Sequence, residues 1–167
     1  RQKALRDRRI AGEVEDTIVL CEHHPATITL GRGAQRGERP VILPPPGTDV
    51  IEIERGGLAT WHGPGQLVAY PIVKLDKGGG FGVLALIRGL EQWVISYLRG
   101  LGLDAGIVEG KTGVWIAGER KIASIGIAVS HWVSYHGLAL NFATGSDPWR
   151  SFNPCGFDPE VMTDLQR

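Results

Sequence analysis

The sequence GVWIAGERKIASIGIAV, residues 113–129, decides the fold. Two runs rich in valine, isoleucine and small residues flank the polar turn GER, a pattern typical of a β-hairpin. We therefore expect two adjacent antiparallel strands and a sheet to which both belong. The turn also places Lys121 at the beginning of the second strand, and a lysine at that position is usually a solvated surface charge.

Similar short runs recur on both sides of this hairpin and predict further strands. They lie at residues 16–23, 26–30, 50–54, 67–73, 106–109 and 135–142. Apolar residues at three- and four-residue spacing predict one long helix from Leu84 to Leu101. The opening segment is helix-like, and a last helix is expected near Asp158. The chain is thus predicted to be a single domain, 1–167, of the α/β (α+β) class, with a mixed, largely antiparallel sheet flanked by helices.

Charge and composition exclude several classes of protein. The 18 basic and 18 acidic residues cancel, which argues against a general nucleic-acid-binding protein. No apolar run is long enough to span a membrane and no signal peptide is visible, so the cytoplasm is the expected location. The chain begins with Arg1, and we expect it to be trimmed at one or both ends. The basic segment with Arg32, Arg36 and Arg39 is interpreted as a solvated loop, and the alternative is docking of an acidic partner.

Two polar features have ordinary explanations when each is taken alone. RGGLATWHGPGQ, residues 55–66, is interpreted as a loop whose glycines let a backbone approach a ligand, although such loops are usually only turns. It lacks the Gly-Lys-Ser/Thr ending of a P-loop. The five histidines have no metal-site spacing and are interpreted as polar residues at strand ends, so no metal is expected.

The two cysteines are too few for a disulfide framework. Cys21 ends an apolar run and is expected to be an inert thiol in a buried strand. Cys155 lies in the loop FNPCG, where a thiol has no packing role. A lone loop cysteine is more often a bystander than a nucleophile. Together, however, Cys155 and Lys121 could form a pair in which the ammonium stabilises the thiolate, which is the nucleophilic form of cysteine.

Four segments together resemble one known family. RGGLATWHGPGQLVAYPI, KIASIGIAVSHWVSYHGLALNF, FNPCG and HPATITLGR are similar to segments of the octanoyl-(acyl carrier protein):protein N-octanoyltransferases, also called lipoyl(octanoyl) transferases or lipoate-protein ligase B. The resemblance covers nearly the whole chain. It implies the α/β catalytic-domain fold of biotin and lipoate protein ligases, and an acyltransferase of protein lipoylation that needs no cofactor.

The resemblance also implies roles for individual residues. Cys155 would carry the acyl thioester, and Lys121 would activate it. The implied substrate-binding residues are Arg55, Gly56, Gly57, Leu58, Ala59, Thr60, Trp61, His62, Ser124, Ile125, Gly126, Gly137, Leu138, Ala139 and His24. One departure is Trp61, where the family usually has tyrosine or phenylalanine. The indole ring is larger, so we do not assume that the pocket wall is the same as in the family.

The implied reaction consists of two acyl transfers. Cys155 takes an octanoyl or lipoyl group from acyl carrier protein, and a lysine of an apo lipoyl domain then takes it as an amide. The expected partners include glycine cleavage H protein and 2-oxoacid dehydrogenase E2 subunits, and the enzyme is expected to be a monomer. Backbone N–H groups near Cys155 or Lys121 are expected to form the oxyanion hole. The alternatives are an ATP-dependent lipoate or biotin ligase, which needs no nucleophilic cysteine, and a non-catalytic domain that binds acyl groups or carrier proteins.

Overall fold

The computed structural model describes residues 1–36, 41–78 and 80–166, which form two β-sheets. The larger sheet has six strands in the order β1–β5–β9–β8–β7–β6, and the smaller has three in the order β3–β2–β4. Their bounds are β1 Thr17–Cys21, β2 Thr27–Leu30, β3 Asp49–Glu52, β4 Ala59–His62, β5 Gln66–Ile72, β6 Ala105–Val108, β7 Lys111–Ile116, β8 Arg120–Ser130 and β9 Val133–Asn141. All neighbouring strands are antiparallel except β2 and β3. The mixed, largely antiparallel architecture predicted from the sequence is confirmed.

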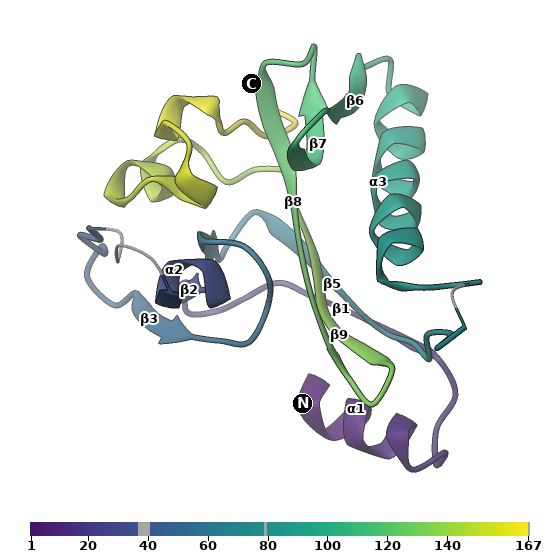
Figure 1. Cartoon of the computed structure of the whole chain (residues 1–167). Coiled ribbons are helices and arrows are strands. Elements are labelled where there is room, and N and C mark those ends of the chain that lie inside the picture. The colour runs from purple at the N-terminus through teal and green to yellow at the C-terminus, as the bar shows by residue number, and fades with distance from the viewer. Residues whose placement is uncertain (37–40, 79, 167) are drawn as a thin grey trace.

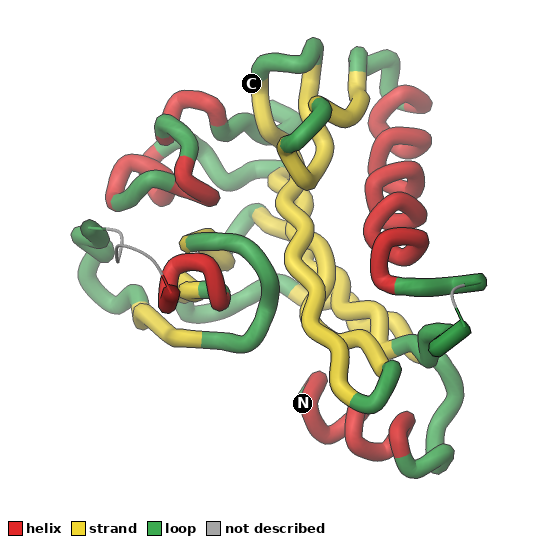
Figure 2. The backbone as a smooth tube through the Cα atoms, viewed as in Figure 1, coloured by secondary structure: helices red, strands yellow, loops and turns green. Residues whose placement is uncertain are grey.

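Helices lie on both sides of the six-stranded sheet (Figure 1). The helices are α1 Gln2–Ile10, α2 Arg32–Arg36 and α3 Val83–Gly100, followed by the 3₁₀ helices η1 Asp147–Ser151, η2 Pro154–Gly156 and η3 Pro159–Val161. Helix α3 runs along one side of the sheet, whereas the smaller sheet and the 3₁₀ helices lie on the other side. Helix α1 lies at the turn between β8 and β9, and Figure 2 shows these two strands as a long central ribbon.

The main hydrophobic core lies between α3 and the six-stranded sheet. Leu90, Val94 and Leu98 extend from one side of the helix and pack with Val114 and Ile122 of the strands. Burying a leucine or valine side chain of this kind contributes about 1.5–3 kcal/mol, so the amphipathic pattern that predicted the helix also explains its position. This packing leaves the opposite side of the sheet free to line a cavity.

The predicted hairpin is formed by β7 and β8. Ala117 and Gly118 at its turn both have positive φ angles, 49° and 71°, as tight hairpin turns require. The register shifts within the pair: Val114 lies opposite Ala123, but Trp115 lies opposite Lys121, so Ile122 has no partner between them. Such a bulge changes the direction in which the following side chains point.

Three sequence-based expectations were wrong in detail. Strand β1 is an edge strand whose Ile18 and Leu20 are more than half exposed, and Cys21 is only partly buried. The expected buried strand at residues 16–23 is therefore half-buried. The glycine-rich segment 55–66 is not only a loop, because it contains the buried strand β4.

Among residues 1–36, 41–78 and 80–166, no helix is long and apolar enough to cross a membrane.

Candidate active site

A cavity of about 390 Å³ lies between the six-stranded sheet and the smaller sheet. Strands β2 and β4 line one side of it, and β8 and β9 line the other. The segment Arg55–Leu58, the turn between β6 and β7, and the loop that carries Cys155 close the remaining sides. Pockets of this size commonly hold small ligands. The site is thus assembled from segments that lie far apart in the sequence.

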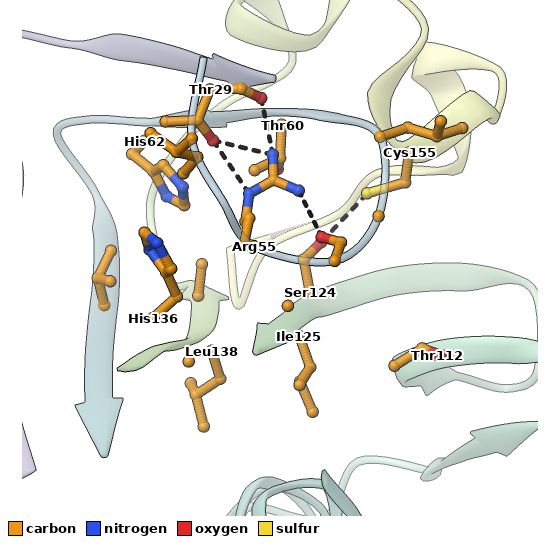
Figure 3. A pocket seen from close by; sticks show the side chains of 18 of the residues that line it. Thr29, Arg55, Thr60, His62, Thr112, Ser124, Ile125, His136, Leu138 and Cys155 are labelled. Atoms are coloured by element: carbon orange, nitrogen blue, oxygen red, sulfur yellow. Dashed lines mark hydrogen bonds between the residues drawn. The ribbon is translucent and has the colours of Figure 1, made fainter. Parts of the chain in front are cut away.

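Arg55 lies in the middle of this cavity and is held by strand β2 (Figure 3). Its Nη2 atom donates to the carbonyl oxygen of Thr29 at 2.7 Å and to Thr29 Oγ1 at 2.9 Å. Its Nε atom donates to the same hydroxyl at 3.2 Å, and Nη1 donates to the carbonyl oxygen of Gly56 at 3.0 Å. Burial lowers the pKa of Arg55, and attraction to Cys155 works in the opposite direction.

Cys155 is presented by the 3₁₀ helix η2 in a left-handed backbone conformation. Its φ angle is 54°, and that of Gly156 is 80°. The left-handed conformation costs a residue with a Cβ about 1–2 kcal/mol, and such conformations concentrate at functional sites. The thiol is partly buried, and its Sγ atom lies 3.9 Å from Ser124 Oγ of β8. The loop thus directs a free thiol into the cavity.

Lys121 is almost completely buried, which the sequence did not predict. Its exposed fraction is 3%, and its Nζ atom lies 5.2 Å from the ring centre of Phe157 and 5.6 Å from that of Trp115. An uninterrupted strand would send residues 121 and 124 to opposite sides. Because of the bulge in β8, both Lys121 and Ser124 line the cavity.

Gly113 makes room for this lysine. Its φ angle is 119°, which favours glycine, and a Cβ atom there would lie 2.9 Å from Cε of Lys121. The N–H group of Gly113 donates at 3.2 Å to the buried carboxylate of Glu91 on α3, which also accepts from Arg88 at 2.6 Å. Helix α3 therefore holds the backbone against which the lysine stem lies.

A buried chain of hydrogen bonds connects the glycine-rich segment to Lys121. His62 Nδ1 lies 2.7 Å from Gln66 Oε1, and Gln66 Nε2 donates to Asn141 Oδ1 at 2.9 Å. Asn141 Nδ2 in turn donates to the carbonyl oxygen of Thr163, whose N–H group donates to the carbonyl oxygen of Lys121. These partners orient both amides, so Nδ1 of His62 donates and Nε2 is left as an acceptor.

Three histidines gather at the end of the cavity near α1. His23 Nε2 lies 2.8 Å from the hydroxyl of Tyr70, and His136 Nδ1 lies 3.2 Å from the side-chain nitrogen of Gln2. Burial lowers the pKa of His62 to about 3 and that of His136 to about 4, so both rings are neutral near pH 7. A charge beside these neutral rings is the carboxylate of Glu54, whose Oε2 lies 3.7 Å from His136 Nε2.

Most of the residues that the resemblance singled out lie in this cavity. Cys155 and Lys121 line it, and so do Arg55, Gly56, Gly57, Leu58, Thr60, His62, Ser124, Ile125, Gly126, Gly137, Leu138 and Ala139. Because side chains alternate along β4, Ala59 and Trp61 point away from it into the core beside the smaller sheet. There Trp61 contacts the ring of Trp149, with centres 5.7 Å apart. The ring of Trp61 therefore lies in the core and not among the residues that line the cavity.

His24 does not line the cavity. Its side chain is 64% exposed and lies 3.1 Å from Glu22 Oε1, outside the residues that line the cavity. The neighbouring His23 lines the cavity instead. Thr29, Tyr70 and Phe157 also line the cavity. They were not predicted, because only strand pairing and loop closure bring them there. His62 is the last residue of β4, as the interpretation of the histidines as polar residues at strand ends expects, whereas His136 lies inside β9, and both are buried.

No group of three or more possible metal ligands occurs among residues 1–36, 41–78 and 80–166. The cavity brings together a free thiol, a buried ammonium and a buried guanidinium. Groups of these types can carry out acyl transfer through a covalent intermediate.

Comparison with known proteins defines the class to which this fold and site belong. The model of the lipoyl protein ligase A/B catalytic domain matches residues 1–167, so the chain belongs to that family. Lipoate-protein ligase A bound with ATP has a similar solved structure, with a TM-score of 0.69 and 18% identity over 96% of this chain and 69% of that chain. At this identity the similarity establishes the fold alone.

Sequence comparison narrows the class further. An octanoyltransferase of Clavibacter sepedonicus is 41% identical over 175 residues, covering 100% of this chain and 72% of its own. An octanoyltransferase of Mycobacterium tuberculosis (strain ATCC 25618 / H37Rv) is 43% identical, with 98% of this chain and 69% of its own covered. The family recognised from the sequence is confirmed, and so is the class of enzyme, an acyltransferase.

Proposed function

We propose that the enzyme transfers an octanoyl group from acyl carrier protein to a lysine of an apo lipoyl domain, with Cys155 carrying the group between them. The observation that carries this proposal is that Cys155 and Lys121, which are distant in the sequence, line one cavity. The curated relatives named octanoyltransferase support the choice of acyl group.

The reaction proceeds through two tetrahedral intermediates. The Cys155 sulfur attacks the thioester carbon of the carrier-bound group, the bond to the carrier sulfur breaks, and the thiol proton ends on the carrier thiol. The lysine ε-amine of the lipoyl domain then attacks the new thioester, the bond to Cys155 Sγ breaks, and a proton from the amine returns to the cysteine. Lys121 stabilises the thiolate and assists the proton transfer from the amine.

The acyl chain occupies the apolar part of the cavity. Ile125 of β8, Leu138 of β9 and Val68 of β5 line it. A Cβ at Gly126 would lie 3.1 Å from Cδ of Arg55, and one at Gly137 would meet the carbonyl oxygen of Ala69 on β5. Glycine at these positions therefore lets the segments of the cavity wall pack closely against β8 and β9.

Intact-mass measurement tests this function directly. The protein is incubated with octanoyl acyl carrier protein in EDTA and without nucleotide, and peptide mapping locates the added group. We expect one octanoyl group on Cys155, which is discharged when an apo lipoyl domain is added. A strict requirement for ATP would place the enzyme with the ligases. If no adduct forms either with octanoyl acyl carrier protein or with octanoate and ATP, the protein is only a binding domain.

Helix α2 is the proposed contact for the acidic carrier protein. Its Arg32 and Arg36 are exposed, and the N–H group of Gly33 donates to the carbonyl oxygen of Gly57 at 3.0 Å beside the cavity. Arg39 lies outside the described residues. Charge reversal of Arg32 and Arg36 is expected to raise KM for the carrier-bound substrate at low salt but not KM for octanoyl-pantetheine. Charge reversal of the exposed Arg8 on α1 is the control and should change neither value. If the Arg32 and Arg36 variant has the same KM for the carrier-bound substrate as the wild type, this contact is wrong.

The remaining partners follow from the same reaction. Glycine cleavage H protein and 2-oxoacid dehydrogenase E2 subunits are the proposed acceptors, because they carry lipoyl domains. We place the monomeric enzyme in the cytoplasm, where a catalytic thiol stays reduced.

A further inference from the structure

Arg55 is a buried charge with no carboxylate beside it. Its exposed fraction is 6%, and none of the ion pairs found among residues 1–36, 41–78 and 80–166 includes it. All its hydrogen bonds go to neutral oxygens of Thr29 and Gly56. An unpaired buried charge is costly, so a protein that keeps one gains by it elsewhere.

The surrounding backbone is shaped around this guanidinium. A Cβ atom at Gly31 would lie 2.7 Å from Nη1 of Arg55, and one at Gly57 would lie 3.4 Å from the same atom. A Cβ atom at Gly126 would lie 3.1 Å from Cδ. Three glycines from three segments therefore enclose the arginine, and Thr29 fixes its orientation. The charge is held in one place before any ligand arrives.

One donor of the guanidinium remains free. Arginine has five N–H donors. Nε uses one on Thr29, Nη2 uses two on the same residue, and Nη1 uses one on Gly56. The second N–H group of Nη1 has no acceptor in the described part of the chain. Figure 3 shows the Nη1 side of the guanidinium facing the part of the cavity that holds Ser124 and Cys155.

We propose that Arg55 stabilises the negatively charged oxygen of the tetrahedral intermediates that form at Cys155. When the sulfur attacks the thioester carbon, the π electron pair of the carbonyl group moves to the oxygen, and the charge and free N–H group of Arg55 receive it. The pair returns to the carbon when the bond to the carrier sulfur breaks. The same exchange occurs when the amine attacks the acyl-enzyme. This inference rests on the proposed function and adds a catalytic residue to it.

Two reactions of the Cys155 thiol distinguish stabilisation of the oxyanion by Arg55 from an effect of Arg55 on the thiol itself or on folding. Acylation of Cys155 by octanoyl acyl carrier protein passes through an oxyanion, whereas alkylation by iodoacetamide is a direct displacement and forms none. We expect Arg55→Met to lower the rate constant of acylation about 10²- to 10³-fold. The alkylation rate should fall far less, because only the attraction between Arg55 and the Cys155 thiolate is lost in that reaction. Arg55→Lys should lie between Arg55→Met and the wild type. Arg120→Met, which removes an exposed arginine next to Lys121, should change neither rate.

The same measurements can overturn the inference. An equal loss of acylation and alkylation in Arg55→Met would mean that Arg55 acts on the thiol or on folding, and no loss of acylation would mean that it has no such role. If Arg55→Met does not fold, the test uses Arg55→Lys and 1,1,1-trifluoro-2-nonanone, which forms a tetrahedral adduct with thiols. This ketone should inhibit Arg55→Lys at least about tenfold more weakly than the wild type, and equal inhibition would overturn the inference. A wild-type protein that is never acylated on Cys155 would instead overturn the proposed function.

Discussion

Lys121 is a buried cation that faces two aromatic rings, those of Trp115 and Phe157. In the described part of the chain it has no carboxylate partner within ion-pair distance. Such an ammonium is available to a thiolate in the same cavity and to a proton in transfer. Its position therefore suits reaction better than it suits stability, since a buried lysine without a partner is costly.

Replacing Lys121 tests this role. We expect Lys121→Ala to lower the rate of octanoyl transfer about 10²- to 10⁴-fold, because both thiolate stabilisation and proton transfer are lost. Lys121→Arg keeps the charge but does not release a proton, so it should restore formation of the acyl-enzyme better than transfer to the amine. Single-turnover measurements of each step, with the exposed Lys77→Ala as control, distinguish these effects. Unchanged rates in Lys121→Ala would refute the assignment.

Gly113 should control both stability and the position of that lysine. Gly113→Ala forces a side chain into a left-handed conformation, against the carbonyl oxygen of Ala123 and against Cε of Lys121. We expect a loss of about 1–3 kcal/mol in the free energy of unfolding, together with slower transfer. Gly106→Ala on the adjacent strand β6 is the control, because a Cβ atom there meets nothing within 4 Å. Urea unfolding gives the first quantity, and a stable Gly113→Ala protein with normal transfer would contradict the interpretation.

Strand β5 begins at a glutamine that connects several elements. Gln66 is buried and bonds to His62, to the carbonyl oxygen of Trp61 and to Asn141. Gln66→Leu leaves these three partners unsatisfied, and we expect it to lower the free energy of unfolding by about 3 kcal/mol. The exposed Gln92→Leu on α3 should have little effect. Because Asn141 belongs to the same chain of bonds, Asn141→Leu should cost less in the Gln66→Leu background than in the wild type. Additive losses would mean that the two residues act separately.

The elements themselves were largely predictable. The spacing of Leu84 to Leu101 matches helix α3, and the runs of branched residues match β2, β5, β7, β8 and β9. These predictions succeed because long periodic patterns reflect burial on one side. Strand β4 was missed because four residues between glycines give too short a pattern. The bulge at Ile122 was missed because nothing in a single strand indicates the register of its partner.

The site was predictable only where a distinctive motif marks it. Cys155 and Lys121 were recognised from the family resemblance, whereas neither would be singled out by burial or periodicity alone. Thr29 and Tyr70 come from strands that look ordinary, and only the pairing of β2 with β4 and of β1 with β5 brings them to the cavity. The choice between His23 and His24 depends on the direction of one side chain, which the local sequence does not determine.

The whole molecule should lose stability in mild acid because it buries neutral histidines. The folded-state pKa values of His62, about 3, and of His136, about 4, lie below the ordinary value near 6.5. Between pH 6.5 and 4 the unfolded chain therefore binds protons that the folded chain does not, and stability falls as the pH falls. At pH 5 the loss is about 2 kcal/mol for each histidine.

Urea unfolding at pH 7 and pH 5 measures this loss. His136→Gln should reduce the difference between the two pH values by about 2 kcal/mol, whatever it does to stability at pH 7. The exposed His24→Gln should leave the difference as it is. A difference that stays the same in His136→Gln would show that this ring is not buried in its neutral form.

Because of the bulge in β8, some residues of this strand serve the stability of the fold and their neighbours serve the reaction. Ile122 and Ala123 pack in the core against α3, whereas Lys121, Ser124 and Gly126 line the cavity. In a library that covers every substitution, scored separately for cellular abundance and for growth that depends on lipoylation, neighbouring codons should therefore behave differently. Substitutions at 122 and 123 should deplete the protein itself. Polar or small substitutions at 121 should leave its abundance intact and abolish growth, and bulky substitutions at 124, which fill the cavity, should lower growth more than abundance. A map of the two scores along this strand would then show the register shift without a structure.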